Sequence, residues 1–278
     1  MIFVKNNQFA SAYLRADQIA ENLFASVYMN ALPKDISGKT IFFVKSADPD
    51  LVIKASTSGC KIIYDPIDTF AYADRHGWKH WYYFVDTVLA YNEEMAEFLK
   101  EWFKNVVIIP HQWDARLKTA SPVPMDKFRP GYIGHSFNCP SIVPESGVSM
   151  IIDPSEMMSW ADNFNCHVSI REPGSLEARM KPATKVSLAA AVGAVIITTP
   201  DASAVELLPK DYPYWCPTVD QFHEVLEKAK SEFGGEIWNK ALDMLANVRN
   251  KTSIEAVASL YQKLNAPVLD SEPIAQKE

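Results

Sequence analysis

Short apolar runs alternate with amphipathic stretches along most of this chain. The runs Thr40–Lys45 and Cys60–Tyr64 are continuous and rich in bulky, strand-prone residues, which is typical of strands buried in a parallel sheet. The stretches Ala10–Phe24 and Pro49–Ser58 carry apolar residues at helical spacing. Strands that alternate with helices in this way predict an α/β protein with parallel sheets.

The same pattern continues to the end of the chain. Further strands are predicted at Ile2–Val4, Ser26–Met29, Asp86–Tyr91, Val106–Ile109, Pro130–His135, Gly147–Asp153, Cys166–Ile170, Ala194–Thr199 and Pro213–Pro217, and further helices at Asn92–Phe103, Ser155–Phe164, Lys185–Val192, Thr218–Lys230 and within Trp238–Leu264. The stretch Asp114–Arg129 has several prolines and little hydrophobic periodicity, which predicts a linker. A chain of 278 residues accommodates two domains of about 100–150 residues each. We therefore expect domains at 1–115 and 130–266, a linker at 116–129 and a disordered polar tail at 267–278.

The segment Arg171–Leu208 reads as loop, helix, strand, loop and helix. Pro182 suits the first turn of a helix, where its missing N–H has no partner to lose. Gly193 is suited to the left-handed residue that ends a helix. Lys181 and Lys185 are four positions apart, so they are predicted to share one helix face.

These features together predict an anion site. The start of a helix attracts phosphate through its free N–H groups and its positive dipole end. Lys181, Lys185, Arg171 and Arg179 would add positive charge at the same place. A diphosphate group fits such a site, whereas the alternative is that these are solvated charges on an amphipathic crossover helix.

The same residues resemble the donor-binding core of GT-B glycosyltransferases, in a group 1-like form of reduced size. The resemblance rests on Lys181-Pro182 with Lys185, on Gly193 followed by the run AVIITT, and on the helix ending in Glu206-Leu207-Leu208. It implies two Rossmann-like domains with a cleft between them and a nucleotide sugar held by the C-terminal domain. Leu188 departs from the pattern, because many retaining members have a ribose-binding glutamate there.

The resemblance also suggests a set of donor ligands. The run Tyr132–His135 resembles the first strand of the donor domain, where a glycine lets the backbone approach the nucleotide. Ser203 and Ala204 would offer backbone N–H groups, and Glu206 a carboxylate, to ribose or phosphate. The complete set is Gly134, His135, Arg171, Lys181, Lys185, Ser203, Ala204 and Glu206.

Candidate catalytic bases lie in the first half of the chain. Asp65 and Asp68 follow a predicted strand, and ligands gather at the carboxyl edge of open α/β sheets. Either carboxylate could deprotonate an attacking sugar hydroxyl, or it could simply cap the next helix. His76 and His80 form a second candidate, and His111 is expected at the interdomain cleft.

Composition narrows the choice of function. The chain is 48% hydrophobic and 22% charged, as in a folded protein, and its net charge of −7 disfavours general binding to nucleic acids or anionic membranes. Its four cysteines have no metal-ligand spacing and read as reduced thiols. No secretory signal and no apolar run of ~20 residues is visible, so we expect a cytoplasmic protein without a transmembrane segment.

The resulting prediction is a metal-independent, hexosyltransferase-like glycosyltransferase. It would move a sugar from a nucleotide-sugar donor to a carbohydrate or another hydroxyl acceptor, with no cofactor. Two alternatives stay open. One is a sugar-nucleotide epimerase of the same architecture, and the other is a non-catalytic protein that binds a nucleotide or sugar.

Overall fold

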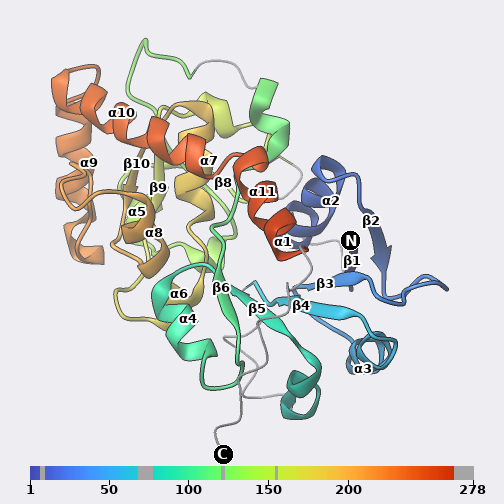
Figure 1. Cartoon of the computed structure of the whole chain (residues 1–278). Coiled ribbons are helices and arrows are strands. Elements are labelled where there is room, and N and C mark those ends of the chain that lie inside the picture. The colour runs from blue at the N-terminus through green and yellow to red at the C-terminus, as the bar shows by residue number, and fades with distance from the viewer. Residues whose placement is uncertain (7–9, 68–77, 120–122, 154–155, 266–278) are drawn as a thin grey trace, which may run out of the picture.

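The computed structural model describes residues 1–6, 10–67, 78–119, 123–153 and 156–265, which form two α/β units side by side (Figure 1). The first unit has a parallel sheet in the order β2-β1-β3-β4-β5-β6. The second has a parallel sheet in the order β10-β9-β7-β8. The strands are β1 (Ile2–Lys5), β2 (Ser26–Met29), β3 (Thr40–Val44), β4 (Lys61–Asp65), β5 (Thr87–Ala90), β6 (Val106–Ile108), β7 (Pro130–Ile133), β8 (Ser149–Ile151), β9 (Cys166–Ser169) and β10 (Val195–Thr198).

Helices connect successive strands in both units. In the first unit they are α1 (Ala10–Ala12), the π-helical η1 (Tyr13–Gln18), α2 (Ile19–Asn22), α3 (Pro49–Thr57), η3 (Trp78–Phe84), α4 (Glu93–Leu99) and η4 (Ala115–Thr119). The rest are η5 (Ser136–Asn138), α5 (Ile142–Glu145), η6 (Ala161–Asn163), α6 (Leu176–Met180), α7 (Thr184–Val192), α8 (Ala202–Leu207), η7 (Val219–Gln221), α9 (Phe222–Ser231), α10 (Glu236–Lys251) and α11 (Ile254–Leu264). Within the ranges described, no helix combines the length and apolarity that a bilayer span requires.

The predicted fold class of two parallel α/β units is confirmed, but several elements differ in detail. The stretch predicted as a helix over Ser155–Phe164 contains only the 3-10 turn η6 among its described residues. The predicted strand at Pro213–Pro217 is reduced to a single bridge between Trp215 and Thr198. A separate helix, α6, was not predicted, because five residues are too few to show helical periodicity.

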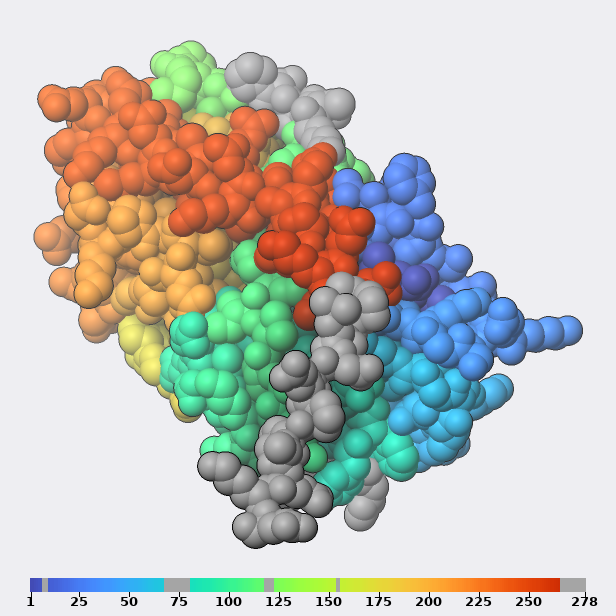
Figure 2. Space-filling view, viewed as in Figure 1, coloured from blue at the N-terminus to red at the C-terminus, as the bar shows by residue number. Residues whose placement is uncertain are grey.

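The two units have separate cores, and the last helix crosses between them. One core surrounds β1, β3, β4 and β5, and the other surrounds β7, β9, β10 and α7. Helix α10 covers the second unit, whereas α11 packs its buried Val257 and Tyr261 into the first core (Figures 1 and 2). The ring of Tyr261 lies 5.2 Å from that of Phe42, between centroids. The 130–266 segment predicted as one domain therefore ends in a helix that stabilises the other unit.

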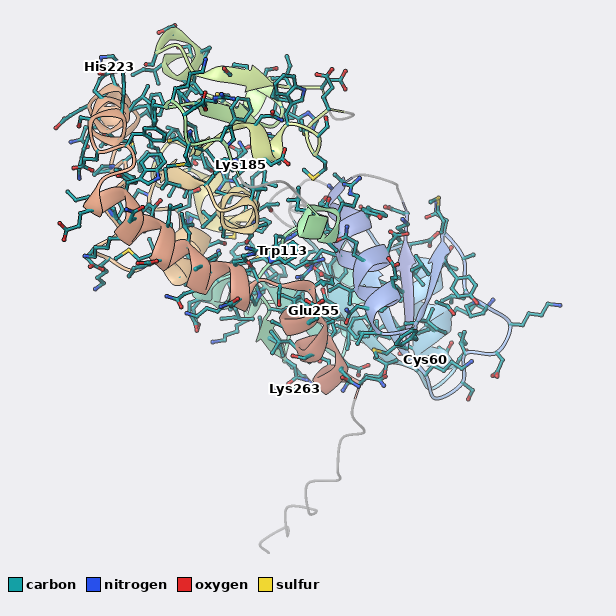
Figure 3. The ribbon with its side chains drawn as sticks, turned by 90° about the horizontal axis from the view of Figure 1, so that it is seen from above. Cys60, Trp113, Lys185, His223, Glu255 and Lys263 are labelled. Atoms are coloured by element: carbon teal, nitrogen blue, oxygen red, sulfur yellow. The ribbon has the colours of Figure 1, made fainter. Side chains whose placement is uncertain are left out.

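The linker after β6 is held against this crossing point. The Trp113 N–H donates to the Thr252 carbonyl, and its indole N–H donates to the Arg249 carbonyl, both at 3.0 Å. The Gln18 amide donates to Asp114 at 2.7 Å, which attaches the linker to the first unit as well. Trp113 accordingly lies where the two units meet (Figure 3).

Candidate functional site

The carboxyl ends of three neighbouring strands in the second sheet bring the predicted site residues Gly134 and Arg171 together with Asp201, which was not predicted. Gly134 follows β7, Arg171 lies just beyond β9, and Asp201 just beyond β10. Gly134 has φ +150°, and a Cβ added there would lie 3.2 Å from both Cε and Nζ of Lys185. The backbone conformation therefore favours a glycine here, and a side chain at this position would also crowd the end of Lys185.

Lys185 is the most unusual cation of this group. Its amino group lies 3.6 Å from the centroid of the Tyr132 ring, a cation–π contact. In the part of the chain that the structure describes, no carboxylate forms an ion pair with it, although Arg171 pairs with Asp201, and Lys181 with Glu177. Desolvation by burial, and then the positive charge of Arg171, hold the pKa of Lys185 well below its ordinary value. An anion bound here would stabilise the charged form of the Lys185 amino group.

Lys181 reaches the same region from a different helix. It is the C-cap of α6, with an extended backbone of φ −80° and ψ 143°, and α7 begins only at Thr184. The prediction that Lys181 and Lys185 share one helix face is therefore wrong, because the chain turns between them. The Lys181 amino group donates to the Asn138 side chain at 2.9 Å. Two short elements thus supply the two lysines.

Arg171 belongs to a small polar network at the ends of β9 and β10. Its guanidinium pairs with Asp201, and its backbone N–H donates to the Thr199 hydroxyl at 3.2 Å. That hydroxyl donates to Asp201 at 2.7 Å. Burial raises the pKa of Asp201, and the charge of Arg171 opposes this shift. Asp201 and Thr199 were not predicted as site residues, although their place directly after a buried strand was a usable signal.

Residues of α8 contact the first unit. The Ser203 hydroxyl donates to the Lys181 carbonyl at 2.9 Å and accepts from the Asn92 side chain at 2.7 Å. A Glu206 carboxylate oxygen accepts the Glu93 N–H at 2.6 Å. Ala204 is buried, and its N–H donates to the Asp201 carbonyl at 2.9 Å. The N–H that was expected to meet a ligand is therefore used within the turn that starts α8.

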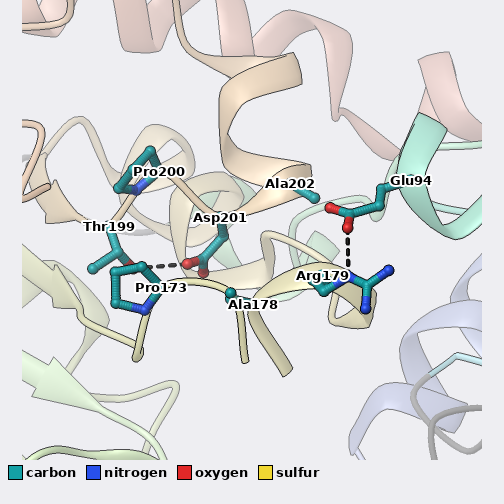
Figure 4. Close-up of a pocket in the computed structure, with 9 residues that line it drawn as sticks. Glu94, Pro173, Ala178, Arg179, Thr199, Pro200, Asp201 and Ala202 are labelled. Atoms are coloured by element: carbon teal, nitrogen blue, oxygen red, sulfur yellow. Dashed lines mark hydrogen bonds and ion pairs between the residues drawn. The ribbon is translucent and has the colours of Figure 1, made fainter. Parts of the chain in front are cut away.

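The contacts of α8 belong to a larger set that we call the interdomain latch, formed by Asn92, Glu93 and Glu94 at the start of α4 with Arg179, Ser203 and Glu206 of the second unit. Asn92 is fully buried and also donates to the Arg179 carbonyl at 3.1 Å. Glu94 forms an ion pair with the Arg179 side chain, and both residues line a cavity of about 140 Å³ (Figure 4). Thr199 and Asp201 line the same cavity, so the latch borders the strand-end network.

The latch was not predicted. Its clearest signal was Asn92, an asparagine placed between a buried strand and two glutamates that begin a helix. Its side chain does cap α4, because it accepts the Met95 N–H at 2.7 Å. No sequence pattern indicated that the same side chain would also bind Ser203 of α8.

Asp65 lies in a buried polar cluster and not at an open edge. Both it and Arg15 are fully buried, and Arg15 Nε donates to Asp65 Oδ2 at 2.8 Å. The hydroxyl of Tyr91 donates to Oδ1 at 2.5 Å, and that of Tyr261 donates to Oδ2 at 2.7 Å. Burial raises the pKa of Asp65, but the Arg15 charge and these hydrogen bonds outweigh it, so the pKa is lowered. A carboxylate with both oxygens occupied and no solvent contact is poorly placed to receive a proton from a substrate.

Of the other candidate residues, only His111 has a side chain that the structure describes. Asp68 and His76 lie outside the described residues, as does the side chain of His80. His111 is buried, and its backbone carbonyl accepts the Ser187 hydroxyl at 3.2 Å. It lines a cavity of about 380 Å³ together with Glu206 and Lys251, as its predicted position between the units implies.

Leu188, where the family resemblance implied a ribose-binding glutamate, has a structural role. Leu188 is buried in an apolar cluster with Trp113 and Leu117 of the linker region. An apolar side chain at this position stabilises the contact between α7 and the linker. Over the described ranges, no group of three or more histidine, cysteine or acidic side chains is arranged to hold a metal ion.

Comparisons with known proteins were made at the levels of sequence and structure. No protein-family model and no curated protein sequence matches the chain. A glycosyltransferase from Rickettsia africae is similar in structure, with a TM-score of 0.63 and 11% identity over 95% of this chain and 97% of that one. Anabaena Alr3699/HepE in complex with UDP-glucose gives a TM-score of 0.63 and 10% identity over 95% and 99% of the two chains.

A third similar structure is WaaG, described as a glycosyltransferase involved in lipopolysaccharide biosynthesis. It gives a TM-score of 0.56 and 11% identity over 96% of this chain and 100% of WaaG. All three resemblances extend over nearly the full length of both chains, so they include both units. Identities of this size report on the fold alone, and the chain therefore has the GT-B fold.

Proposed function

We propose that this protein is a metal-independent glycosyltransferase that moves a sugar from a nucleoside diphosphate sugar to a hydroxyl acceptor. The observation that carries the proposal is Lys185, a half-buried cation over the Tyr132 ring without an ion-pair partner among the described residues, placed at the strand ends beside Gly134 and Arg171. Such a cation favours a dianionic ligand such as a diphosphate. The GT-B fold and the donor bound to the Anabaena protein support a nucleotide sugar as its source.

In this proposal the cations act on the leaving group. Negative charge accumulates on the diphosphate as the glycosidic bond breaks, so Lys185, Lys181 and Arg171 stabilise the transition state more than the ground state. Because these side chains supply the neutralising charge, the reaction needs no metal ion. In the same proposal, the Glu206 carboxylate on α8 accepts hydrogen bonds from the hydroxyls of the donor's ribose.

The latch occupies groups that the donor would need. The cavity beside Asp201 is about 140 Å³, below the roughly 300–1,000 Å³ that is usual for ligand sites, whereas the cavity beside Glu206 measures about 380 Å³. The Glu206 carboxylate is also occupied by the Glu93 N–H. We infer that α4 withdraws from α8 before a donor enters, and that Glu206 then exchanges the N–H for the donor's hydroxyls.

The proposed base follows from the surroundings of Asp65. The saturated hydrogen bonding of Asp65 favours a structural role for that residue. Asp68 is therefore the proposed base of an inverting reaction, with the pair His76 and His80 as the alternative. An Asp68→Ala variant that retains full turnover would remove the residue from the mechanism.

The proposal is tested first by binding. A panel of UDP, GDP, CMP, ADP and dTDP is added to the protein, and a nucleotide that binds the folded state raises the melting temperature. We expect one nucleotide to do so, with the shift abolished in Lys185→Ala and retained in Lys240→Ala, a control lysine on the exposed face of α10. No shift with any nucleotide would contradict the proposal.

Turnover then separates the remaining functions. The matching nucleotide sugar is incubated with EDTA-treated protein and a panel of sugar acceptors, and release of the nucleotide is followed. Acceptor-dependent release supports the transferase. Conversion of the donor alone to an epimer would support the epimerase, and binding without any turnover would support a non-catalytic protein.

A further inference from the structure

An exposed pair of stacked aromatic rings lies directly beside the cationic site. Phe137 on η5 is 81% exposed. Its ring is stacked on that of His135, with centroids 5.1 Å apart and planes inclined by 8°. Since His135 covers only one face of the ring, the opposite face of Phe137 is open to a ligand.

The turn that carries Phe137 is held in place by the site itself. The Tyr132 hydroxyl donates to the His135 carbonyl at 2.9 Å, and the Asn138 N–H donates to the same carbonyl at 3.1 Å. The Lys181 amino group donates to the Asn138 side chain at 2.9 Å. His135 is thus held by Tyr132, which contacts Lys185, and Asn138 is held by Lys181. The Phe137 ring between them is positioned without being buried.

Polar groups suited to a ribose lie on the other side of the site. The sheet order β10-β9-β7-β8 places Asp201 and α8, with Glu206, on the far side of β9 from the turn after β7. Carboxylates accept hydrogen bonds from hydroxyls, whereas an aromatic face favours the C–H face of a sugar ring. A nucleoside diphosphate sugar bound across Lys181 and Lys185 would therefore direct its nucleoside toward β10 and its sugar toward β7.

We propose that the open face of Phe137, backed by His135, is the subsite that stacks against the transferred sugar of the donor. This inference rests on the proposed function and goes beyond it, because it assigns recognition of the sugar to a residue that contacts neither phosphate nor nucleoside. A single exposed apolar side chain is normal on a protein surface, but a stacked pair anchored to a cationic site is a more specific arrangement.

The test compares UDP with UDP-glucose by titration calorimetry. Variants Phe137→Ala and Phe137→Trp are measured beside wild type, with Tyr83→Ala as a control because Tyr83 is a 91% exposed aromatic residue of the first unit. An aromatic contact contributes about 0.5–1.5 kcal/mol, so Phe137→Ala should weaken UDP-glucose binding about 2- to 12-fold. UDP binding should stay unchanged in every variant, and Phe137→Trp should retain affinity for UDP-glucose.

Each other outcome overturns the inference in a recognisable way. Equal losses for UDP and UDP-glucose would show that the ring stacks on the nucleoside. No loss for either ligand would show that Phe137 forms no donor subsite. If wild type binds neither ligand, the proposed function with a uridine nucleotide as donor fails, and the subsite fails with it. If wild type binds UDP and Lys185→Ala does not, the proposed function is upheld regardless of the result for the Phe137 variants.

Discussion

Replacement of Asp65 by asparagine tests whether this residue is structural. The carboxylate accepts hydrogen bonds from Arg15, Tyr91 and Tyr261, and so connects β4, η1, the end of β5 and α11. Asparagine has nearly the same shape, but it has no charge and its amide NH₂ faces groups that are themselves donors. The variant therefore leaves the buried Arg15 guanidinium without a counter-ion.

The expected cost is large. Removing one partner of a buried ion pair usually costs about 3–5 kcal/mol, because the other charge stays desolvated. The Arg15 guanidinium also lies 5.2 Å from the Tyr91 ring centroid and 5.0 Å from that of Tyr261, and these contacts retain part of its stabilisation. We therefore expect a loss of about 3 kcal/mol, which corresponds to a lower melting temperature on the order of 10 °C.

The effect should depend on pH. The pKa of Asp65 is lowered in the folded protein from the ordinary value of 3.8, so its contribution is fully present above that value and is lost as the pH falls through the lowered one. Wild type and Asp65→Asn should thus differ most near neutral pH and converge in acid. Urea unfolding followed by tryptophan fluorescence, at a series of pH values, measures this difference.

Two controls make the result interpretable. Asp243→Asn changes the same group at an exposed position of α10 and should leave stability unchanged within about 0.5 kcal/mol. Tyr261→Phe removes one hydrogen bond to the carboxylate and should cost about 1.5–3 kcal/mol. If Asp65→Asn is as stable as wild type yet loses turnover, the structural assignment is refuted and the residue returns as a candidate base.

Three further predictions concern the second unit and its cleft. Glu94→Gln removes the latch ion pair with Arg179, which contributes at most about 1 kcal/mol because both side chains are exposed, so nucleotide affinity should rise by up to about fivefold. An unchanged or weaker affinity in calorimetry would show that the latch is no barrier to binding. Gly131→Ala places a Cβ 2.2 Å from the Phe164 ring, so overpacking should cost about 1–3 kcal/mol, and an unaltered melting curve would contradict the observed packing. The pKa of Lys185 is lowered, and a bound diphosphate favours the charged amine, so the protein should take up protons when it binds a nucleotide at a pH above that lowered pKa. Calorimetry in buffers of different ionisation enthalpy detects this uptake, and its absence at every pH would refute the role of Lys185.

The sequence was sufficient for most elements and for the parallel architecture. Continuous apolar runs such as Thr40–Val44 form strands because burial on both faces of a sheet requires apolar side chains at every position. Gly193 ends α7 with φ +75°, as the local preference of glycine predicts. Parallel strands end at a common edge, and so the order of elements alone indicated that Gly134 and Arg171 would lie near one another.

Only the tertiary structure decided how these residues are used. A lone Arg15 in a helical stretch carries no sign of its partner Asp65, which is 50 residues away. The hydrogen bond from the Glu93 N–H to Glu206 likewise depends on how the two units pack together. Hydrophobic periodicity and turn preferences are set within a few neighbouring residues, whereas buried ion pairs, the latch and the stacked face of Phe137 arise where elements distant in sequence converge.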